Sequence, residues 1–302
     1  MPARHISLAV YFITLSILCA AIIVGAKMLG QQGAYLAQVY MLTPALAATI
    51  TRAFFYAPRF KDANLRFGKI RDYIKFWAFS LGIIGVWYVV FTILGIIQWD
   101  FTGEVFLEKL ARQLAERGQD INETLPPGFT PRMMLMIYFV SGLTVFNIFP
   151  GIITGFGEEF GHRGFMFPLL YQIRPWVGLI VGGLIWYAWH LPLTLVMPQP
   201  IEYPLWQALV ISAIGAIFAF IYLAYIYVKS ESIFVTSVAH ITMNNAVVAF
   251  SYFAVIQDQR LMNLGLVLIM MVVVAILYYK KELDVFARYF ATSERNVSVQ
   301  VS

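Results

Sequence analysis

The chain has 302 residues, of which 60% are hydrophobic and only 12% charged, with a formal net charge of +5. A soluble domain carries about 25% charged residues, so this composition excludes an ordinary water-soluble protein and predicts that lipid surrounds most of the chain. The net positive charge does not indicate nucleic-acid binding, because the basic residues gather in the loops between apolar segments, as membrane topology requires. The alternating pattern of a membrane barrel is absent. We predict an all-α, polytopic bundle of transmembrane helices.

Eight apolar segments are long enough to cross a bilayer, which takes about 20 apolar residues in a helix. They are 7–28, 35–57, 74–98, 133–155, 176–197, 206–228, 233–256 and 261–279. The first is too long for the apolar part of a signal peptide, so we expect a retained helix. No internal repeat divides the chain, and we treat residues 1–302 as one integral-membrane domain in the cell membrane.

The charges between these segments predict the orientation of the chain. One group of basic residues lies around the link between the second and third segments: Arg52, Arg59, Lys61, Arg66, Lys69, Arg71 and Lys75. The loop 99–132 is richer in acid: Asp100, Glu104, Glu108, Glu116, Asp120 and Glu123. By the positive-inside rule the first loop is cytoplasmic and the second is outside. Arg4, Lys280 and Lys281 then place both termini in the cytoplasm.

Two segments depart from a simple series of crossings. In the extramembrane loop 99–132, apolar residues at helical spacing between Glu104 and Arg117 predict a short amphipathic linker helix. Pro126, Pro127 and Pro131 follow it and end it. The apolar region 133–173 would form a helix of about 60 Å, longer than a bilayer needs. We expect it to break or kink at Pro150 and Gly151.

Few ionisable groups lie within the apolar segments. They are Glu158, Glu159, His162, Arg163, His190 and His240. Each costs several kcal/mol at membrane depth unless it is paired, so each suggests a function. Glu159 and Arg163 are four residues apart and can form a salt bridge on one helix face, whereas Glu158 points about 100° away. His240 is likewise one turn from Asn244, so three helices offer polar groups to one cavity.

Three interpretations of these groups remain open. A carboxylate beside an imidazole can deprotonate a water, and a second histidine with an asparagine can donate to an oxyanion, which together suit hydrolysis of an amide. The same residues suit the substrate site or proton relay of a transporter. They could also be buried pairs that only fix helix packing. Glu158, His190 and His240 form a chemically reasonable zinc-ligand set.

These residues resemble a known family, the CAAX prenyl protease 2 type, also called CPBP for CAAX proteases and bacteriocin-processing enzymes. Its motif E-E-x-x-x-R is matched by Glu158, Glu159 and Arg163. An aromatic residue followed four positions later by histidine is matched by Trp186 and His190, and H-x-x-x-N is matched by His240 and Asn244. The flanks "RGFMFPLL" and "WHLPL" also look like the family. The resemblance covers a catalytic core at about 150–250.

The resemblance implies an intramembrane endopeptidase that cleaves a membrane-associated or CAAX-like peptide. It implies that Glu158 and His190 activate the water, that His240 and Asn244 stabilise the oxyanion, and that Glu159 and Arg163 support the site. Members have been described both as metal-independent and as metalloproteases; we favour no cofactor and keep zinc as the alternative, beside a non-catalytic scaffold. His162 stands where the family usually has an aromatic ring, and either packing or an influence on Glu158 would explain it.

Overall fold

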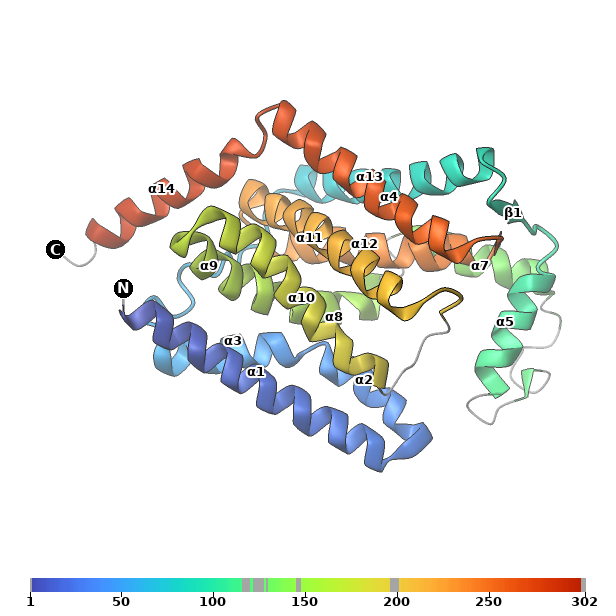
Figure 1. Cartoon of the computed structure of the whole chain (residues 1–302), viewed down its shortest axis with the longest axis horizontal. Coiled ribbons are helices and arrows are strands. Elements are labelled where there is room, and N and C mark those ends of the chain that lie inside the picture. The colour runs from blue at the N-terminus through green and yellow to red at the C-terminus, as the bar shows by residue number, and fades with distance from the viewer. Residues whose placement is uncertain are drawn as a thin grey trace.

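The computed structural model describes residues 2–115, 120–121, 128, 130–144, 148–195 and 201–299. The chain folds almost wholly into helices, with one two-stranded sheet in the described ranges (Figure 1). The α-helices in chain order are α1 (Pro2–Met28), α2 (Leu36–Tyr40), α3 (Thr43–Phe55), α4 (Ile70–Ile93), α5 (Glu104–Ala115), α7 (Pro131–Leu143), α8 (Ile148–Gly161), α9 (Phe167–Ile173), α10 (Gly182–His190), α11 (Leu205–Ser230), α12 (Ile233–Ser251), α13 (Gln259–Tyr279) and α14 (Asp284–Val299). Short 3-10 turns lie at Gly30–Tyr35 and Leu191–Leu195, and π-helical turns at His162–Met166 and Val177–Val181.

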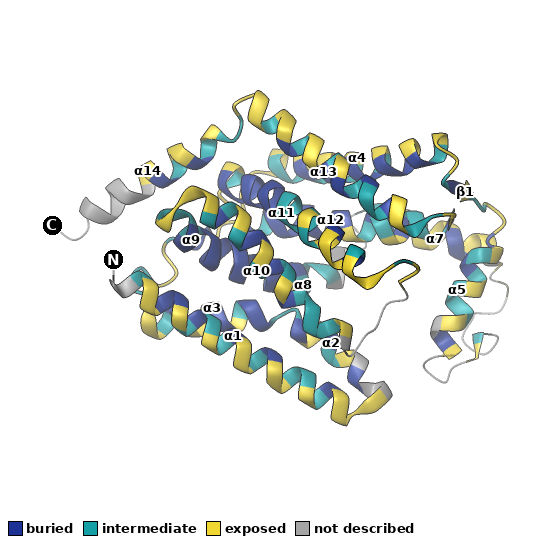
Figure 2. Ribbon diagram, in the orientation of Figure 1, coloured by how far each residue is buried: buried dark blue, intermediate teal, exposed yellow. Residues whose placement is uncertain are grey.

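Six helical stretches in the described residues are long and apolar enough to cross a membrane. They are Arg4–Met28, Ile70–Ile93, Val177–Thr194, Leu205–Ser230, Ile233–Ser251 and Gln259–Tyr279. Large apolar side chains such as Ile17 on α1 and Leu268 on α13 are exposed, as lipid-facing residues are. Figure 2 shows exposed positions along both of these helices. The chain is therefore a multi-pass membrane protein built as a helical bundle.

The other two predicted crossings are divided. The segment 35–57 turns between α2 and α3. Pro44 lies in the first turn of α3, where its missing N–H costs no hydrogen bond. The segment 133–155 ends its first helix at Thr144, which is extended, and starts again at Ile148. Pro150 therefore lies in the first turn of α8, and the predicted break at Pro150 and Gly151 was a few residues too late.

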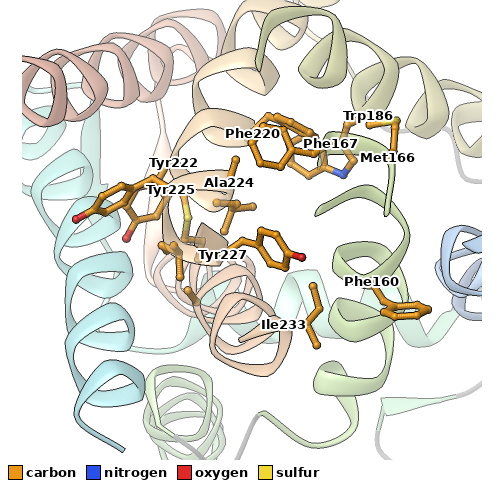
Figure 3. Close-up of a cluster of buried hydrophobic side chains, with 14 of the residues drawn as sticks. Phe160, Met166, Phe167, Trp186, Phe220, Tyr222, Ala224, Tyr225, Tyr227 and Ile233 are labelled. Carbon is orange, nitrogen blue, oxygen red and sulfur yellow. The ribbon is translucent and has the colours of Figure 1, made fainter. Parts of the chain in front are cut away.

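Helix α12 lies at the centre of the bundle and packs on α4, α7, α8 and α11. Helices α1, α2 and α3 cover the far side of α8 (Figure 1). Between α8, α10 and α11 the core is rich in rings, among them Phe160, Phe167, Trp186, Phe220 and Tyr227 (Figure 3). The described helices enclose the segment 157–164. Its ionisable side chains are all buried: Glu158, Glu159, His162 and Arg163.

The two ends of the bundle carry different loops. Both termini lie at one end, and α5 and β1 lie at the other (Figure 1). The basic linker meets the first end, since Ser232 at the start of α12 donates to the carbonyls of Arg66 and Phe67. The predicted grouping of basic residues with the termini thus agrees with the fold.

The predicted linker helix is present as α5, but it docks on the protein. Phe106 is fully buried against Met134, Leu135 and Phe253. Near α5, β1 (Ile97–Trp99) pairs antiparallel with β2 (Ala254–Ile256), a long-range contact that the sequence did not predict. Glu116, Glu123, Pro126 and Pro127 lie outside the described residues.

Candidate active site

Two glycines in the stretch "GEEFGHRG" allow α8 to lie directly against the start of α3. A Cβ added at Gly161 would lie 2.4 Å from the carbonyl carbon of Pro44, and one at Gly157 would lie 2.7 Å from the carbonyl oxygen of Met41. No real side chain tolerates such contacts with backbone, so both positions require glycine. Small residues four apart are how membrane helices approach closely. With the glycines facing α3, the side chains of Glu158 and Glu159 lie on other faces of α8.

Glu159 joins α8 to the π-helical turn that follows it and to α12. Its Oε1 atom accepts a hydrogen bond from Nη1 of Arg163 at 2.8 Å and lies 2.8 Å from Nδ1 of His240. All three side chains are buried, with exposed fractions of 0% for Glu159 and Arg163 and 6% for His240. The predicted salt bridge within the helix is therefore present, and it also holds His240.

Glu158 lies beside the histidine of the second motif. Its Oε2 atom is 3.5 Å from Nε2 of His190 and accepts a hydrogen bond from Nε1 of Trp186 at 3.2 Å. Nδ1 of His190 lies 2.9 Å from the carbonyl oxygen of Trp186, one turn earlier in α10. A carbonyl can only accept, so Nδ1 donates, and in the neutral imidazole Nε2 then carries a lone pair on the side of Glu158. Two acceptors side by side suit one shared water.

The guanidinium of Arg163 is held between two aromatic rings. Its Cζ atom lies 4.4 Å from the centre of the Trp186 ring and 4.2 Å from that of Phe220 on α11. Such contacts favour a cation that has left water. Glycines again permit the approach, because a Cβ at Gly183 would lie 2.8 Å from Cα of Ile217. Sequence reasoning missed Phe220, one of 25 phenylalanines with no local signal.

His162 is completely buried, and neither ring nitrogen has a hydrogen-bond partner among the described residues. Its ring meets that of Trp189 edge-to-face at 5.1 Å, and Trp189 in turn meets His190 at 4.5 Å. His162 makes no hydrogen bond to Glu158, but the two side chains interact electrostatically. The ring contact with Trp189 fits the packing interpretation, in which the imidazole takes the place of an aromatic ring, and an influence on Glu158 stays the alternative prediction.

Asn244 lies one turn beyond His240 on α12 and is exposed. It makes no hydrogen bond to Glu158, Glu159 or His190 in this structure. His190 is the other accessible member of the group, with 35% of its side chain exposed, whereas Glu158 is 5% exposed. The site is thus open at His190 and closed around the carboxylates.

The alternative zinc-ligand set Glu158, His190 and His240 stays a prediction. No group of three histidine, cysteine, aspartate or glutamate side chains there is placed to hold a metal ion. Nδ1 of His240 faces Glu159 and Nδ1 of His190 faces a carbonyl, which leaves the Nε2 atom of each ring available.

Comparison with known proteins relates part of this chain to a protein family. No curated protein matches the chain. A family model matches one segment of the chain, and this segment contains all six predicted site residues, from Glu158 to Asn244. The match supports a CAAX-type protease, an enzyme whose substrate is a peptide or membrane protein. The resemblance deduced from the motifs is confirmed, because residues 140–246 match the family described as Type II CAAX prenyl endopeptidase Rce1-like.

Proposed function

We propose that the protein is an intramembrane endopeptidase in which Glu158 and His190 together activate the water that cleaves a peptide bond. The observation that carries this proposal is the 3.5 Å separation of Glu158 Oε2 and His190 Nε2. Catalytic acid–base groups must lie within hydrogen-bond reach of the same water, and these two do. Residues from α8 and α10, 32 positions apart in the chain, meet here in a mostly buried setting.

The reaction follows from the direction of each hydrogen bond. The water donates one hydrogen to Glu158 and one to the lone pair on Nε2 of His190. As its oxygen bonds to the scissile carbonyl carbon, a proton passes to Glu158, and the carbonyl oxygen becomes an oxyanion. The proton then moves to the amide nitrogen, and the C–N bond breaks to release an amine and a carboxylic acid. Trp186 holds Glu158 in place through its N–H.

His240 and Asn244 supply the oxyanion side of the proposed site. Glu159 fixes the ring of His240 by taking the hydrogen bond from Nδ1, so that Nε2 is the ring nitrogen left for substrate. When both nitrogens are protonated, Nε2 donates to the oxyanion. The exposed amide of Asn244, one turn further along α12, is free to donate as well.

The proposed substrate is a membrane-associated or CAAX-like peptide that reaches the site from the cytoplasm. Ile233, the first residue of α12, lies beside the basic linker, because its N–H donates to the carbonyl of Asn64. His240 is seven residues further on, or about 10 Å along a helix. A cleavage site near the cytoplasmic surface is therefore within reach of His240.

Cleavage of tethered peptides by the purified protein in lipid vesicles tests the proposal. The peptides should include C-terminal prenylated sequences and membrane-spanning sequences. We expect Glu158→Gln and His190→Ala each to lower kcat by at least about a hundredfold, because each removes a group that moves the proton. Glu282→Gln, a change at an exposed ion pair with Lys229, should leave kcat unchanged.

Two results would contradict an endopeptidase of this kind. One is cleavage that persists in Glu158→Gln with its rate unaltered. The other is absence of cleavage of every peptide together with solute flux across the vesicle, which would favour a transporter.

Removal of metal tests the cofactor separately. We expect full activity after exhaustive chelation and dialysis, with no stoichiometric metal in the active protein by elemental mass spectrometry. Loss of activity on chelation and its return with one equivalent of zinc would instead establish the zinc-dependent alternative.

A further inference from the structure

We propose that Arg52 is a positioning residue for this site, acting on the backbone of the π-helical turn His162–Met166 that carries Arg163. The proposal rests on the function proposed above. Arg52 comes from α3, 106 or more positions before the glutamates of α8, and belongs to none of the three motifs. It is among the largest fully buried side chains of the protein, with 1% exposed.

The reason for the contact begins with Pro168. In an α-helix the carbonyl of residue 164 would accept from the N–H of residue 168, but proline has no N–H. The backbone between His162 and Met166 takes a π-helical form, in which the N–H of Phe167 bonds the carbonyl of His162 five residues earlier. Nη2 of Arg52 donates to the carbonyl of Gly164. A buried carbonyl without a partner costs about 1–3 kcal/mol, so this contact matters to the local backbone.

Arg52 is itself held firmly from the other side. Its Nη1 atom donates to Oδ1 of Asp62 at 2.6 Å and also to the carbonyl of Arg59. Asp62 is oriented by the hydroxyl of Tyr56, which donates to its Oδ2. The guanidinium also lies 5.2 Å from the ring centres of Tyr56 and Phe165. The linker after α3 is thereby connected through one side chain to the turn after α8.

This connection reaches the proposed chemistry in two steps. Gly164 is the residue after Arg163, whose guanidinium holds Oε1 of Glu159 at 2.8 Å, and the same oxygen lies 2.8 Å from His240. A shift of the Gly164 carbonyl moves Arg163 and therefore the carboxylate that orients His240. Misplacement of a catalytic group by about 1 Å can cost a hundredfold in rate, although Arg52 touches neither substrate nor water.

A pair of substitutions isolates the carbonyl contact. Arg52→Met removes the donor while keeping a long apolar side chain, and Pro168→Ala restores an N–H four residues after Gly164. We expect Arg52→Met to lower kcat by about ten- to a hundredfold with KM nearly unchanged. In the double variant, kcat should recover at least about tenfold from that level. Arg66→Met is the matched control, because Arg66 pairs with Glu231 at an exposed site; its kcat should not change.

Hydrogen exchange of the backbone amides at 163–169 gives a readout that does not depend on proteolysis. We expect faster exchange there in Arg52→Met and a return towards the unaltered rate in the double variant. If the unaltered protein cleaves no peptide, the proposed function fails, and exchange still decides whether Arg52 holds the turn.

The proposal is overturned if Arg52→Met keeps its kcat, or if Pro168→Ala restores neither kcat nor slow exchange. Should Arg52→Met fail to fold, Arg52→Lys replaces it, since one ammonium cannot reach both the Gly164 carbonyl and Asp62. The same loss and the same rescue by Pro168→Ala are then required.

Discussion

Glu159 and Glu158 are adjacent in sequence but have different surroundings. Glu159 contacts two cationic or potentially cationic side chains through one oxygen and has no exposed surface. Glu158 contacts one imidazole and one indole beside the accessible edge of the site. In the proposed mechanism the first carboxylate holds other side chains in place, and the second meets the water.

The hydrogen bond from the indole of Trp186 to Glu158 allows a test of these two different roles. Trp186→Phe keeps a ring beside Arg163 but removes the N–H that Glu158 accepts. A hydrogen bond to a charged group is worth about 1.5–3 kcal/mol, so we expect kcat to fall about tenfold or more. Peptide cleavage kinetics measure this change.

Trp189→Phe is the matched control on the same helix. It removes an indole N–H that donates to Thr43 and not to Glu158. It should lower stability more than turnover, and equal losses of kcat in the two variants would refute a specific role for the Trp186 hydrogen bond.

At the scale of elements, the position of α8 depends on glycines that have no side chain. Gly161→Ala puts a Cβ 2.4 Å from the carbonyl carbon of Pro44, and backbone cannot yield as a side chain can. Forced overpacking costs about 1–3 kcal/mol, so we expect lower thermal stability in detergent and separation of α8 from α3. Gly85→Ala in α4, where no atom lies within 4 Å, should be neutral or slightly stabilising. Equal melting temperatures for the two variants would contradict this account.

The spacing of residues along the sequence predicted the features that depend on one helix alone. The salt bridge between Glu159 and Arg163 follows from their separation by four residues, and α5 follows from the apolar spacing after Glu104. The restart of α8 at Ile148 and the π-helical turn after it were not predicted. Proline can begin a helix or interrupt one, and only the neighbouring elements decide which. Pro150 lies in the first turn of α8, and Pro168 has no N–H to offer the carbonyl of Gly164, which accepts from Arg52.

At the scale of the whole molecule, the separation of charges predicts sidedness. We expect Lys61 and Lys280 to face the cytoplasm and Thr102 to face the opposite side, following the positive-inside rule. Cys19, the one native cysteine, is buried. It should therefore react little with the label when single cysteines are introduced at these three positions. Labelling of intact cells with a membrane-impermeant maleimide should modify only the cysteine at position 102. Labelling of the cysteine at position 61 or 280 would contradict the predicted orientation.

Long-range contacts are the part of the site that the sequence could not supply. His240 meets Glu159 across 81 residues, and the ring of Phe220 meets Arg163 from a third helix. The motifs predicted that these helices would converge, but the choice of partners depends on how α8, α10 and α12 cross. Those crossings are set by glycines such as Gly161 and Gly183, whose role is visible only beside the neighbouring backbone.

Four different constraints act on the residues of the stretch 157–164. Gly157 and Gly161 pack against backbone at the start of α3, and Glu158 lies beside His190. Glu159 pairs with Arg163, and the carbonyl of Gly164 accepts a hydrogen bond from Arg52. A saturation scan should therefore show an unbroken run of damaging substitutions that resembles one large catalytic surface. Measured separately, the amount of folded protein and the turnover of that protein would divide the run, with the glycines losing the first and the carboxylates the second.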